Sequence, residues 1–317
     1  MKSLEERVST FKKVETINSG FKSLDDSTGG FRMGNTYLIG GLEKSGKSSF
    51  LMNIVHHLIK EKNKVAFFDT ELNPEEFFSR MIAIWKDKVI SEVENDKDLQ
   101  LEWAKKFAHL EYMGTEDLTV DGIVSFQKII DSMRVSADNG TKVFFIDNLT
   151  TFNTQPTKEQ QGWQILGKYA ANLATFAKEK DVLIFMVIHT RPDTVFNETP
   201  PGIRTLVENK EPEKIFEESL TIVRKPSLTS VYGGGSALSQ ISGAMLIWRP
   251  FQKFAGDYSS LTCLVLDSFR HSPSGEDIRL EFIGEKGKFV EVNNISPAFE
   301  EAKQLFEEPP APRRDYE

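Results

Sequence analysis

The stretch Gly41-Leu42-Glu43-Lys44-Ser45-Gly46-Lys47-Ser48 fits G-x-x-x-x-G-K-[ST], the pattern of a phosphate-binding loop. It follows an apolar, β-branched run at 36–39, which predicts a strand, and it precedes residues 49–59, whose apolar side chains recur at helical spacing. A strand, a glycine-rich loop and a helix N-terminus in this order direct backbone N–H groups at an anion. The sequence therefore predicts a nucleoside-triphosphate site in an α/β fold.

Each position of the loop has a predicted task in binding ATP and Mg²⁺. Gly41 and Gly46 let the chain curl so that successive amides face the phosphates. Lys47 places a positive charge at the β- and γ-phosphates, and the Ser48 hydroxyl is a predicted Mg²⁺ ligand. The predicted nucleotide-binding residues of the loop are Gly41, Lys44, Ser45, Gly46, Lys47, Ser48 and Ser49.

The composition is that of an ordinary globular protein. Of 317 residues, 39% are hydrophobic and 27% are charged, and the net charge is −8. This acidic balance argues against a surface coated in basic charge for nucleic acid, although a local basic loop remains compatible with it. A single cysteine, Cys263, lies in an apolar run and predicts a buried thiol in a reducing compartment. With no signal peptide or membrane span in the sequence, we expect a cytoplasmic protein without a membrane partner.

Alternating strand and helix patterns predict a mostly parallel central sheet covered by helices on both faces. The predicted strands of this part are 64–69, 110–113, 141–147 and 182–188, and the predicted helices open at Asn73-Pro74 or span 120–133 and 162–180. A β-rich C-terminal part follows, with strands predicted at 244–248, 261–266, 278–282 and 289–292.

Breaks in these patterns predict the domain organisation. Residues 1–17 are predicted to form a leader or linker helix, because Leu4, Val8 and Phe11 share one face. Residues 18–293 form the predicted ATPase domain, and 193–230 are an inserted excursion within it. The predicted tail at 294–317 is a C-terminal helix or disordered segment, which serves either as a docking peptide for a protein partner or as a plain terminus.

Three polar side chains stand where strands of the predicted sheet end. Asp147 follows an apolar strand, where a carboxylate can hold Mg²⁺ through water. Glu71 lies two residues beyond the strand at 65–69 and can activate a water, and Asp69 competes for that role. His189 ends the strand at 182–188, where a neutral imidazole can sense the γ-phosphate.

These features resemble the ATPase domain of DnaB-type replicative helicases, in the RecA-like branch of P-loop ATPases, over roughly residues 15–293. The resemblance is carried by Ser19–Asp25, Gly29–Gly34, Asp69-Thr70-Glu71, Ile146-Asp147-Asn148-Leu149 and His189-Thr190-Arg191-Pro192. It favours Glu71 over Asp69 as the catalytic glutamate. The histidine at the sensor segment is similar to that of phage and mitochondrial members, and a bacterial or phage-encoded protein is expected.

The resemblance also implies roles that spacing alone does not give. The run Gly233-Gly234-Gly235-Ser236 resembles the loop that grips single-stranded DNA, with Arg224 and Lys225 as the nearest cations; a flexible hairpin without a ligand is the alternative. Arg249 and Phe282 match residues that pack on the two faces of adenine. Arg270 matches an arginine finger inserted into the neighbouring subunit's site.

The expected function is that of a ring-forming, hexameric DNA helicase or translocase that hydrolyses ATP and moves along single-stranded DNA. One departure bears on it: Ser268 stands where the family has a lysine that also touches the γ-phosphate, so hydrolysis is expected to be slower or its coupling altered. The alternative is a RecA- or KaiC-like ATPase that regulates a protein partner or mediates recombination. A scaffold with a degenerate nucleotide site is disfavoured by the intact Lys47, Asp147 and Glu71.

Overall fold

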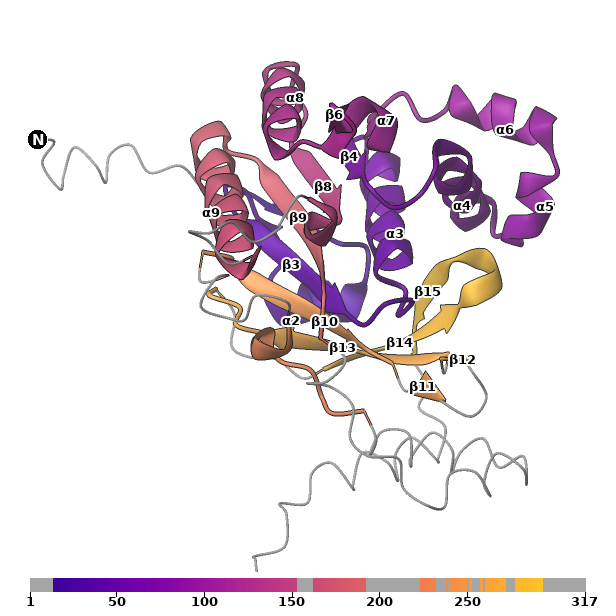
Figure 1. Cartoon of the computed structure of the whole chain (residues 1–317). Coiled ribbons are helices and arrows are strands. Elements are labelled where there is room, and N and C mark those ends of the chain that lie inside the picture. Colours follow the sequence, from indigo (N-terminus) through magenta and orange to yellow (C-terminus); the bar gives the residue numbers. More distant parts are fainter. Residues whose placement is uncertain are drawn as a thin grey trace, which may run out of the picture.

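A large sheet forms the centre of the molecule. The computed structural model describes residues 14–152, 162–191, 223–231, 238, 240–249, 251–252, 257–258, 260–271 and 277–292. The strands of the sheet are β3 (Thr36–Gly41), β4 (Val65–Asp69), β5 (Leu110–Met113), β8 (Val143–Asp147), β9 (Leu183–His189), β10 (Gly243–Trp248), β13 (Leu261–Asp267), β14 (Ile278–Ile283) and β15 (Lys288–Glu291). They lie side by side in the order β15-β14-β13-β10-β3-β9-β8-β4-β5 (Figure 1).

The sheet changes character along this order. From β10 to β5 every neighbouring pair is parallel, whereas β13, β14 and β15 pair antiparallel. The mostly parallel sheet and the β-rich C-terminal part predicted from sequence are thus confirmed. In register, Gly41 pairs with His189 and Asp69 pairs with Asp147. Four parallel strands therefore end at one edge, where their following residues meet.

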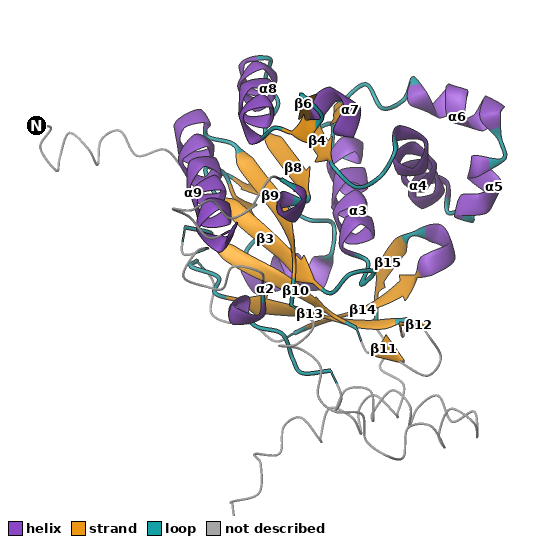
Figure 2. Ribbon diagram, viewed as in Figure 1, coloured by secondary structure: helices purple, strands orange, loops and turns teal. Residues whose placement is uncertain are grey.

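Helices cover both faces of the parallel part (Figure 2). The helices that the structure describes are α2 (Lys22–Thr28), α3 (Lys47–Lys60), α4 (Pro74–Lys86), α5 (Ile90–Glu94), α6 (Lys97–Ala104), α7 (Thr115–Leu118), α8 (Phe126–Asp138) and α9 (Gly162–Lys180), of which α5 and α6 pack on α4. Side chains of α3 and α4 share one hydrophobic cluster with the sheet, and those of α8 and α9 share another. None of these described helices is both long and apolar enough to cross a membrane.

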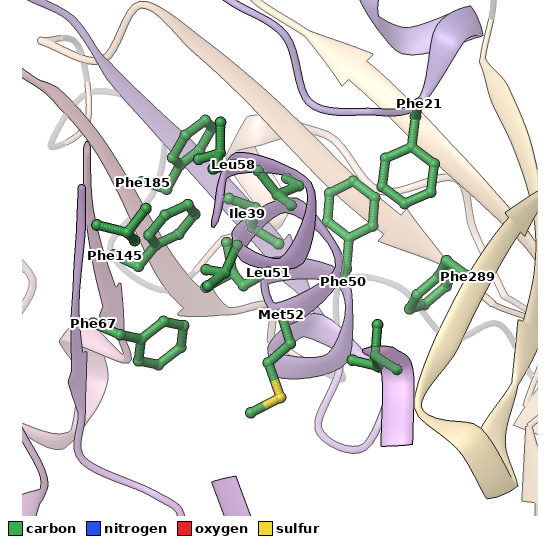
Figure 3. Close-up of a cluster of buried hydrophobic side chains, with 14 of the residues drawn as sticks. Phe21, Ile39, Phe50, Leu51, Met52, Leu58, Phe67, Phe145, Phe185 and Phe289 are labelled. Atoms are coloured by element: carbon green, nitrogen blue, oxygen red, sulfur yellow. The ribbon is translucent and has the colours of Figure 1, made fainter. Parts of the chain in front are cut away.

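The two clusters follow from the alternation of side chains along each buried strand. Phe145 and Phe185 face the α3 side, where their rings stack with centroids 5.0 Å apart. Their neighbours Phe144 and Ile184 face the opposite side. Figure 3 shows α3 laid across the first cluster, with Phe50 among its side chains. Each such buried ring stabilises the fold by roughly 1.5–3 kcal/mol, so the parallel strands contribute much of the hydrophobic stabilisation.

The start of α4 matches its sequence signal. The Asn73 side chain accepts a hydrogen bond from the Glu76 N–H at 2.8 Å, and the Glu76 carboxylate accepts one from the Asn73 N–H at 3.4 Å. This reciprocal pair is a capping box, with Pro74 at the first helical position. The helix predicted to open at Asn73-Pro74 is confirmed.

The helix predicted at 120–133 is wrong in its first turns. Thr119–Val120 (β6) and Ile123–Val124 (β7) form an antiparallel hairpin instead, and α8 begins at Phe126 behind the cap Ser125. The Asp121-Gly122 turn explains the difference: both residues have positive φ, 52° and 79°, as a tight hairpin requires. The dipeptide signal outweighs the apolar periodicity on which the helix was predicted.

The leader helix predicted at residues 1–17 extends too far toward its C-terminal end. Thr16–Ile17 form β1, which pairs antiparallel with Phe31–Arg32 (β2), so a helix reaching residue 17 is wrong at its end. Residues 1–13, 193–222 and 294–317 lie outside the described residues. Two further short strands, β11 (Phe251–Gln252) and β12 (Asp257–Tyr258), pair with each other. Cys263 is partly covered in β13, and burial raises the pKa of its thiol to about 11, so the thiol is neutral.

Candidate nucleotide site

The phosphate-binding loop lies between the end of β3 and the start of α3, as predicted. Gly46 has φ 96° and precedes the first helical residue, and a Cβ added there would lie 3.0 Å from Phe289 Cζ. A Cβ on Gly41 would lie 2.6 Å from Ser45 Oγ. Gly46 therefore requires glycine for its conformation, and Gly41 requires it for space. The loop closes around the N-terminus of α3, where unpaired N–H groups attract an anion.

Lys47 is buried beneath this loop. Its side chain is 5% exposed, and Nζ donates a hydrogen bond to the Leu42 carbonyl at 2.7 Å. Burial lowers the pKa of Lys47, and the carboxylates of Asp147 and Glu71 act in the opposite direction. The ammonium is thus aimed along the loop by a main-chain acceptor, in the position from which it can reach a phosphate.

Asp147 has the environment expected of a residue that binds a cation. The residue is fully buried, and neither carboxylate oxygen has a hydrogen-bond partner within the described residues. Burial raises the pKa of Asp147, and the nearby Asp69 adds to the rise. The Ser48 hydroxyl favours the charged form of Asp147, although its geometry falls short of a full hydrogen bond. A buried carboxylate without partners is costly unless a cation joins it.

The residues here suit Mg²⁺ better than a metal ion that takes all its ligands from protein side chains. The described residues contain no group of three or more His, Cys, Asp or Glu placed to hold an ion. Mg²⁺ in nucleotide sites takes one or two protein oxygens and completes its shell with phosphates and water. Ser48 and Asp147 are the residues that would hold it.

Glu71 is held in place by its own turn. Asp69, itself fully buried, accepts hydrogen bonds from the N–H groups of Glu71 and Leu72, both at 2.9 Å. Asp69 therefore builds the turn, and Glu71 is the carboxylate that reaches the site. Hydrogen bonding from His189 lowers the pKa of Glu71, and its side chain is 33% exposed toward a cavity. Of the two candidates for the water-activating base, the geometry supports Glu71.

His189 at the end of β9 and Asn148 just after β8 both contact Glu71, which follows β4. His189 Nε2 lies 3.1 Å from Glu71 Oε1 and 3.1 Å from Asn148 Nδ2, and Asn148 Nδ2 also donates to Glu71 Oε1. Sequence reasoning singled out Glu71 and His189 but gave Asn148 no role. Its position could have indicated a role, because Asn148 directly follows Asp147 and so lies at the same edge of the sheet.

One cavity joins these groups. It has a volume of about 1070 Å³, and its wall includes Lys47, Ser48, Glu71, His189, Arg80 and Phe282. Arg249 is buried beside it and donates from Nη1 to the Ser45 carbonyl at 3.4 Å. Its guanidinium carbon lies 4.7 Å above the Phe282 ring. The two side chains predicted to pack on opposite faces of adenine are thus in contact with each other, so no base fits between them in this structure.

Arg270 lies at the opposite end of the sheet. Its N–H donates to the Ser242 carbonyl at 2.9 Å, and Ser242 immediately precedes the first residue of β10, which pairs with Tyr37 near the start of β3. The phosphate-binding loop follows the other end of β3. The exposed Arg270 is therefore separated from its own loop by the length of the strand, as a residue that acts on another subunit must be.

The predicted DNA-binding residues are divided by the structure. Gly233, Gly234, Gly235 and Ser236 lie outside the described residues. Lys225 Nζ forms an ion pair with Asp277 at 2.6 Å, and Arg224 lines a small pocket beside Arg249 and Trp248. Both cations are thus placed at the nucleotide side of β10 in this structure.

Comparisons with known proteins agree with these features. The DnaB-like helicase C terminal domain matches residues 16–191. A probable replicative DNA helicase of Trieres chinensis is 21% identical over 284 residues, which cover 87% of this chain and 57% of the relative. The replicative DNA helicase DnaB of Helicobacter pylori strain J99 is 25% identical over 185 residues, or 56% of this chain and 37% of the relative. The chain spans about half the length of these curated relatives.

Two solved structures share the fold. The ATPase domain of G40P superposes with a TM-score of 0.67 at 16% identity, covering 91% of this chain and 95% of that chain. A DnaB-like replicative helicase, solved in a study of its interactions with primase, gives a TM-score of 0.65 at 16% identity, covering 91% of this chain and 64% of that one. With a family match over more than half of its residues, the chain belongs to the DnaB-like helicase C terminal domain family.

Proposed function

We propose that this chain is the ATP-hydrolysing motor of a DnaB-type helicase that moves along single-stranded DNA as a hexameric ring. The observation that carries the proposal is that Lys47 and Glu71 line one cavity, while the Asp147 carboxylate near Lys47 is buried and has no hydrogen-bond partner within the described residues. Such a set has no evident structural purpose, because an unpaired buried carboxylate costs free energy of folding. It suits Mg·ATP, whose charges it complements.

The proposed chemistry assigns each residue one task. Lys47 binds the β- and γ-phosphates, and Ser48 and Asp147 hold Mg²⁺, which neutralises charge on the phosphates. Glu71 takes the proton of the water that attacks the γ-phosphorus, and His189 senses the γ-phosphate from beside Glu71. Arg249 and Phe282 separate to hold the base between them, and the loop residues Gly41, Lys44, Ser45, Gly46 and Ser49 surround the phosphates.

The separation of Arg270 from its own loop supports the ring. A finger supplied by the neighbouring subunit stabilises the charge that develops on the γ-phosphoryl group, and such fingers contribute about 10³-fold or more. ATP then lies between subunits, and hydrolysis at each interface depends on the geometry of two chains.

A hydrogen-bonded path supports coupling between nucleotide and DNA. The Thr190 N–H donates to the Gly41 carbonyl at 3.0 Å, and Thr190 forms an isolated β-bridge with Val231. The Arg191 N–H donates to the Ser230 carbonyl at 2.9 Å. Val231 directly precedes the segment that contains Gly233–Gly235, the proposed DNA-binding loop. The residue after the sensor His189 thus contacts both the phosphate-binding loop and the entry to the DNA loop.

A regulatory ATPase of RecA or KaiC type is the second candidate. The ion pair of Lys225 with Asp277 and the net charge of −8 favour it, since both reduce the positive charge offered to DNA. The family match favours the helicase.

ATP hydrolysis with and without single-stranded DNA, at two salt concentrations, tests the proposal. We expect DNA to stimulate turnover at least several-fold, with less stimulation at higher salt, since phosphate contacts release counterions. Lys47→Ala is the control that removes nucleotide-dependent turnover. Strong turnover without stimulation at either salt concentration would favour the regulatory ATPase, and duplex unwinding would then be absent.

A further inference from the structure

Asn148 contacts two residues of the cavity wall, Glu71 and His189, yet the proposed chemistry gives it no task. Its side chain is fully buried. Its Oδ1 atom accepts hydrogen bonds from the backbone N–H groups of Thr150 at 2.8 Å and Thr151 at 3.1 Å. Two N–H donors fix the carbonyl end of the amide, because a flipped amide would place its NH₂ group against them. The NH₂ end therefore has one possible direction.

That direction is toward the predicted base and the predicted sensor. Asn148 Nδ2 donates to Glu71 Oε1 and lies 3.1 Å from His189 Nε2. His189 Nε2 lies 3.1 Å from the same Glu71 oxygen. A carboxylate is the stronger acceptor in this group, so we assign the Nε2 proton of His189 to the bond with Glu71. Oε1 thus receives donors from the ends of both β8 and β9.

The other carboxylate oxygen of Glu71 differs. None of the hydrogen bonds found among the described residues uses Oε2 of Glu71. The Glu71 side chain lines the cavity and keeps 33% of its surface exposed. Asp69 fixes the main chain of Glu71 by accepting its N–H, and Asn148 and His189 fix the carboxylate by their contacts with Oε1. Oε1 is therefore held by hydrogen bonds, whereas Oε2 is left for the substrate water.

We propose that Asn148 is a positioning residue, which together with His189 holds Glu71 by Oε1 so that Oε2 takes the proton of the attacking water. In the step, the water oxygen bonds to the γ-phosphorus as its proton passes to Oε2. The bond from the γ-phosphorus to the bridging oxygen breaks, and its electron pair leaves on ADP. This inference rests on the proposed function, since it specifies how the base of that reaction is aligned.

Two substitutions of Asn148 separate its donor from its capping role. Asn148→Asp keeps the oxygen that caps Thr150 and Thr151 but replaces the NH₂ donor. Asn148→Ser is neutral, can still cap, and is too short to reach Glu71. We expect both to lower kcat about 10-fold or more, with KM for ATP and the affinity for a fluorescent ADP changed by no more than about 2-fold.

Thr151→Val is the matched control in the same turn. The Thr151 hydroxyl donates to the main-chain carbonyl of Asn148 at 2.9 Å and contacts the Thr70 hydroxyl, but it does not contact the Asn148 NH₂ group. We expect its kcat to stay within about 2-fold of wild type, with the same thermal midpoint as the Asn148 variants. A loss in Thr151→Val equal to that in Asn148→Ser would mean that the turn matters and the donor does not. Full activity in Asn148→Ser would overturn the proposal directly.

A double-mutant cycle with Glu71→Gln completes the test. If Asn148 acts through Glu71, Asn148→Ser lowers the rate of wild type but leaves the small residual rate of Glu71→Gln unchanged. An equal fold-loss in both backgrounds would show that Asn148 acts elsewhere. The cycle is measured on basal hydrolysis, so absent stimulation by DNA would contradict the proposed motor while leaving the assignment of Asn148 intact.

Discussion

The two ends of the parallel strands are built on opposite principles. At the nucleotide edge, several buried polar atoms have no hydrogen-bond partner among the described residues: both carboxylate oxygens of Asp147, Oδ2 of Asp69, the hydroxyls of Ser45 and Thr190, and Nδ1 of His189. At the finger edge, main-chain bonds join the elements: Arg270 N–H to Ser242 carbonyl, and Ser242 N–H to Thr36 carbonyl at 2.8 Å. We call the first the incomplete edge, because its buried polar atoms lack partners, and the second the finished edge or platform, because main-chain bonds hold it together, although Thr36 Oγ1 also lacks a partner there within the described part of the chain.

The comparison suggests how two subunits divide one reaction. Unpaired polar groups favour a charged ligand because the ligand satisfies them. A residue that must reach into a neighbour's site gains from a rigid base, since a misplacement of about 1 Å can cost 10²-fold. Phe269 packs against Gly243 and the Tyr37 ring, with ring centroids 5.8 Å apart, and so fixes the chain next to Arg270.

The largest effect is expected from Asp147→Asn, which neutralises the incomplete edge. We expect ATP hydrolysis to fall about 10²-fold or more, because the Mg²⁺ that Asp147 helps to hold would be displaced or loosened. The affinity for a fluorescent ADP, measured with Mg²⁺ and again with EDTA, is the direct readout. Wild type should bind more tightly with Mg²⁺, and the variant should lose that difference. A variant that keeps the full difference would contradict the ligand role.

Arg270→Ala tests the finished edge. We expect about a 10³-fold loss of turnover with unchanged ADP affinity, since the finger belongs to the neighbour's site. Mixing this variant with Glu71→Gln sharpens the test. Interfaces that combine an intact base from one chain with an intact finger from the other should regain activity that neither variant has alone. Failure of the mixture to exceed both parents, despite demonstrated mixed assembly, would place the finger elsewhere.

A smaller change is expected from Gly243→Ala, which disturbs the platform without touching Arg270. The added Cβ would lie 2.8 Å from the Phe269 ring, so the ring must move. We expect a loss of about 1–3 kcal/mol in the free energy of unfolding, measured in urea, together with reduced turnover. Unchanged stability with unchanged turnover would show that the platform tolerates movement.

The smallest effect concerns pH at the incomplete edge. Burial raises the pKa of Asp69 to about 6, above its unfolded value. Because the folded state binds the proton more tightly, the charged form costs stability above pH 6, and that cost disappears as the pH falls below the unfolded pKa. Asp69→Asn should therefore raise the thermal midpoint at pH 8, by about 1 kcal/mol in stability, and by less at pH 5. A midpoint difference independent of pH would contradict the raised pKa.

How much the sequence predicts differs between the same two edges. The loop at 41–48, Asp147, Glu71 and His189 each follow a strand with a strong apolar pattern, so register brings them together. Asn148 was missed because an amide beside a predicted metal ligand has no distinctive local pattern, and its partners come from other strands. The proposal that Arg270 is a finger comes from family resemblance alone. Its distance from its own loop depends on the antiparallel pairing of β13 with β10, which strand patterns leave open.

The fold shows the same division. Long elements such as α9, predicted at 162–180, match their predicted bounds because many apolar residues fix the period. Predictions of short elements fail where a turn sets the local structure, as in the β6–β7 hairpin at Asp121-Gly122. The small helices α5 and α6 gave no separate signal. They are held by packing around Trp103, whose ring lies 5.4 Å from that of Trp85, and a distant aromatic partner is invisible in a local window.

The contact of Thr190 with Gly41 on one side and Val231 on the other uses main-chain atoms. Main-chain atoms are the same in every residue but proline, so related proteins can exchange the side chains at both positions and still keep the connection. The connection depends on spacing instead: Thr190 lies one residue after His189, and Val231 lies two residues before Gly233. An insertion or deletion between these positions would shift the connection, whereas a substitution at either position would leave its main-chain atoms in place.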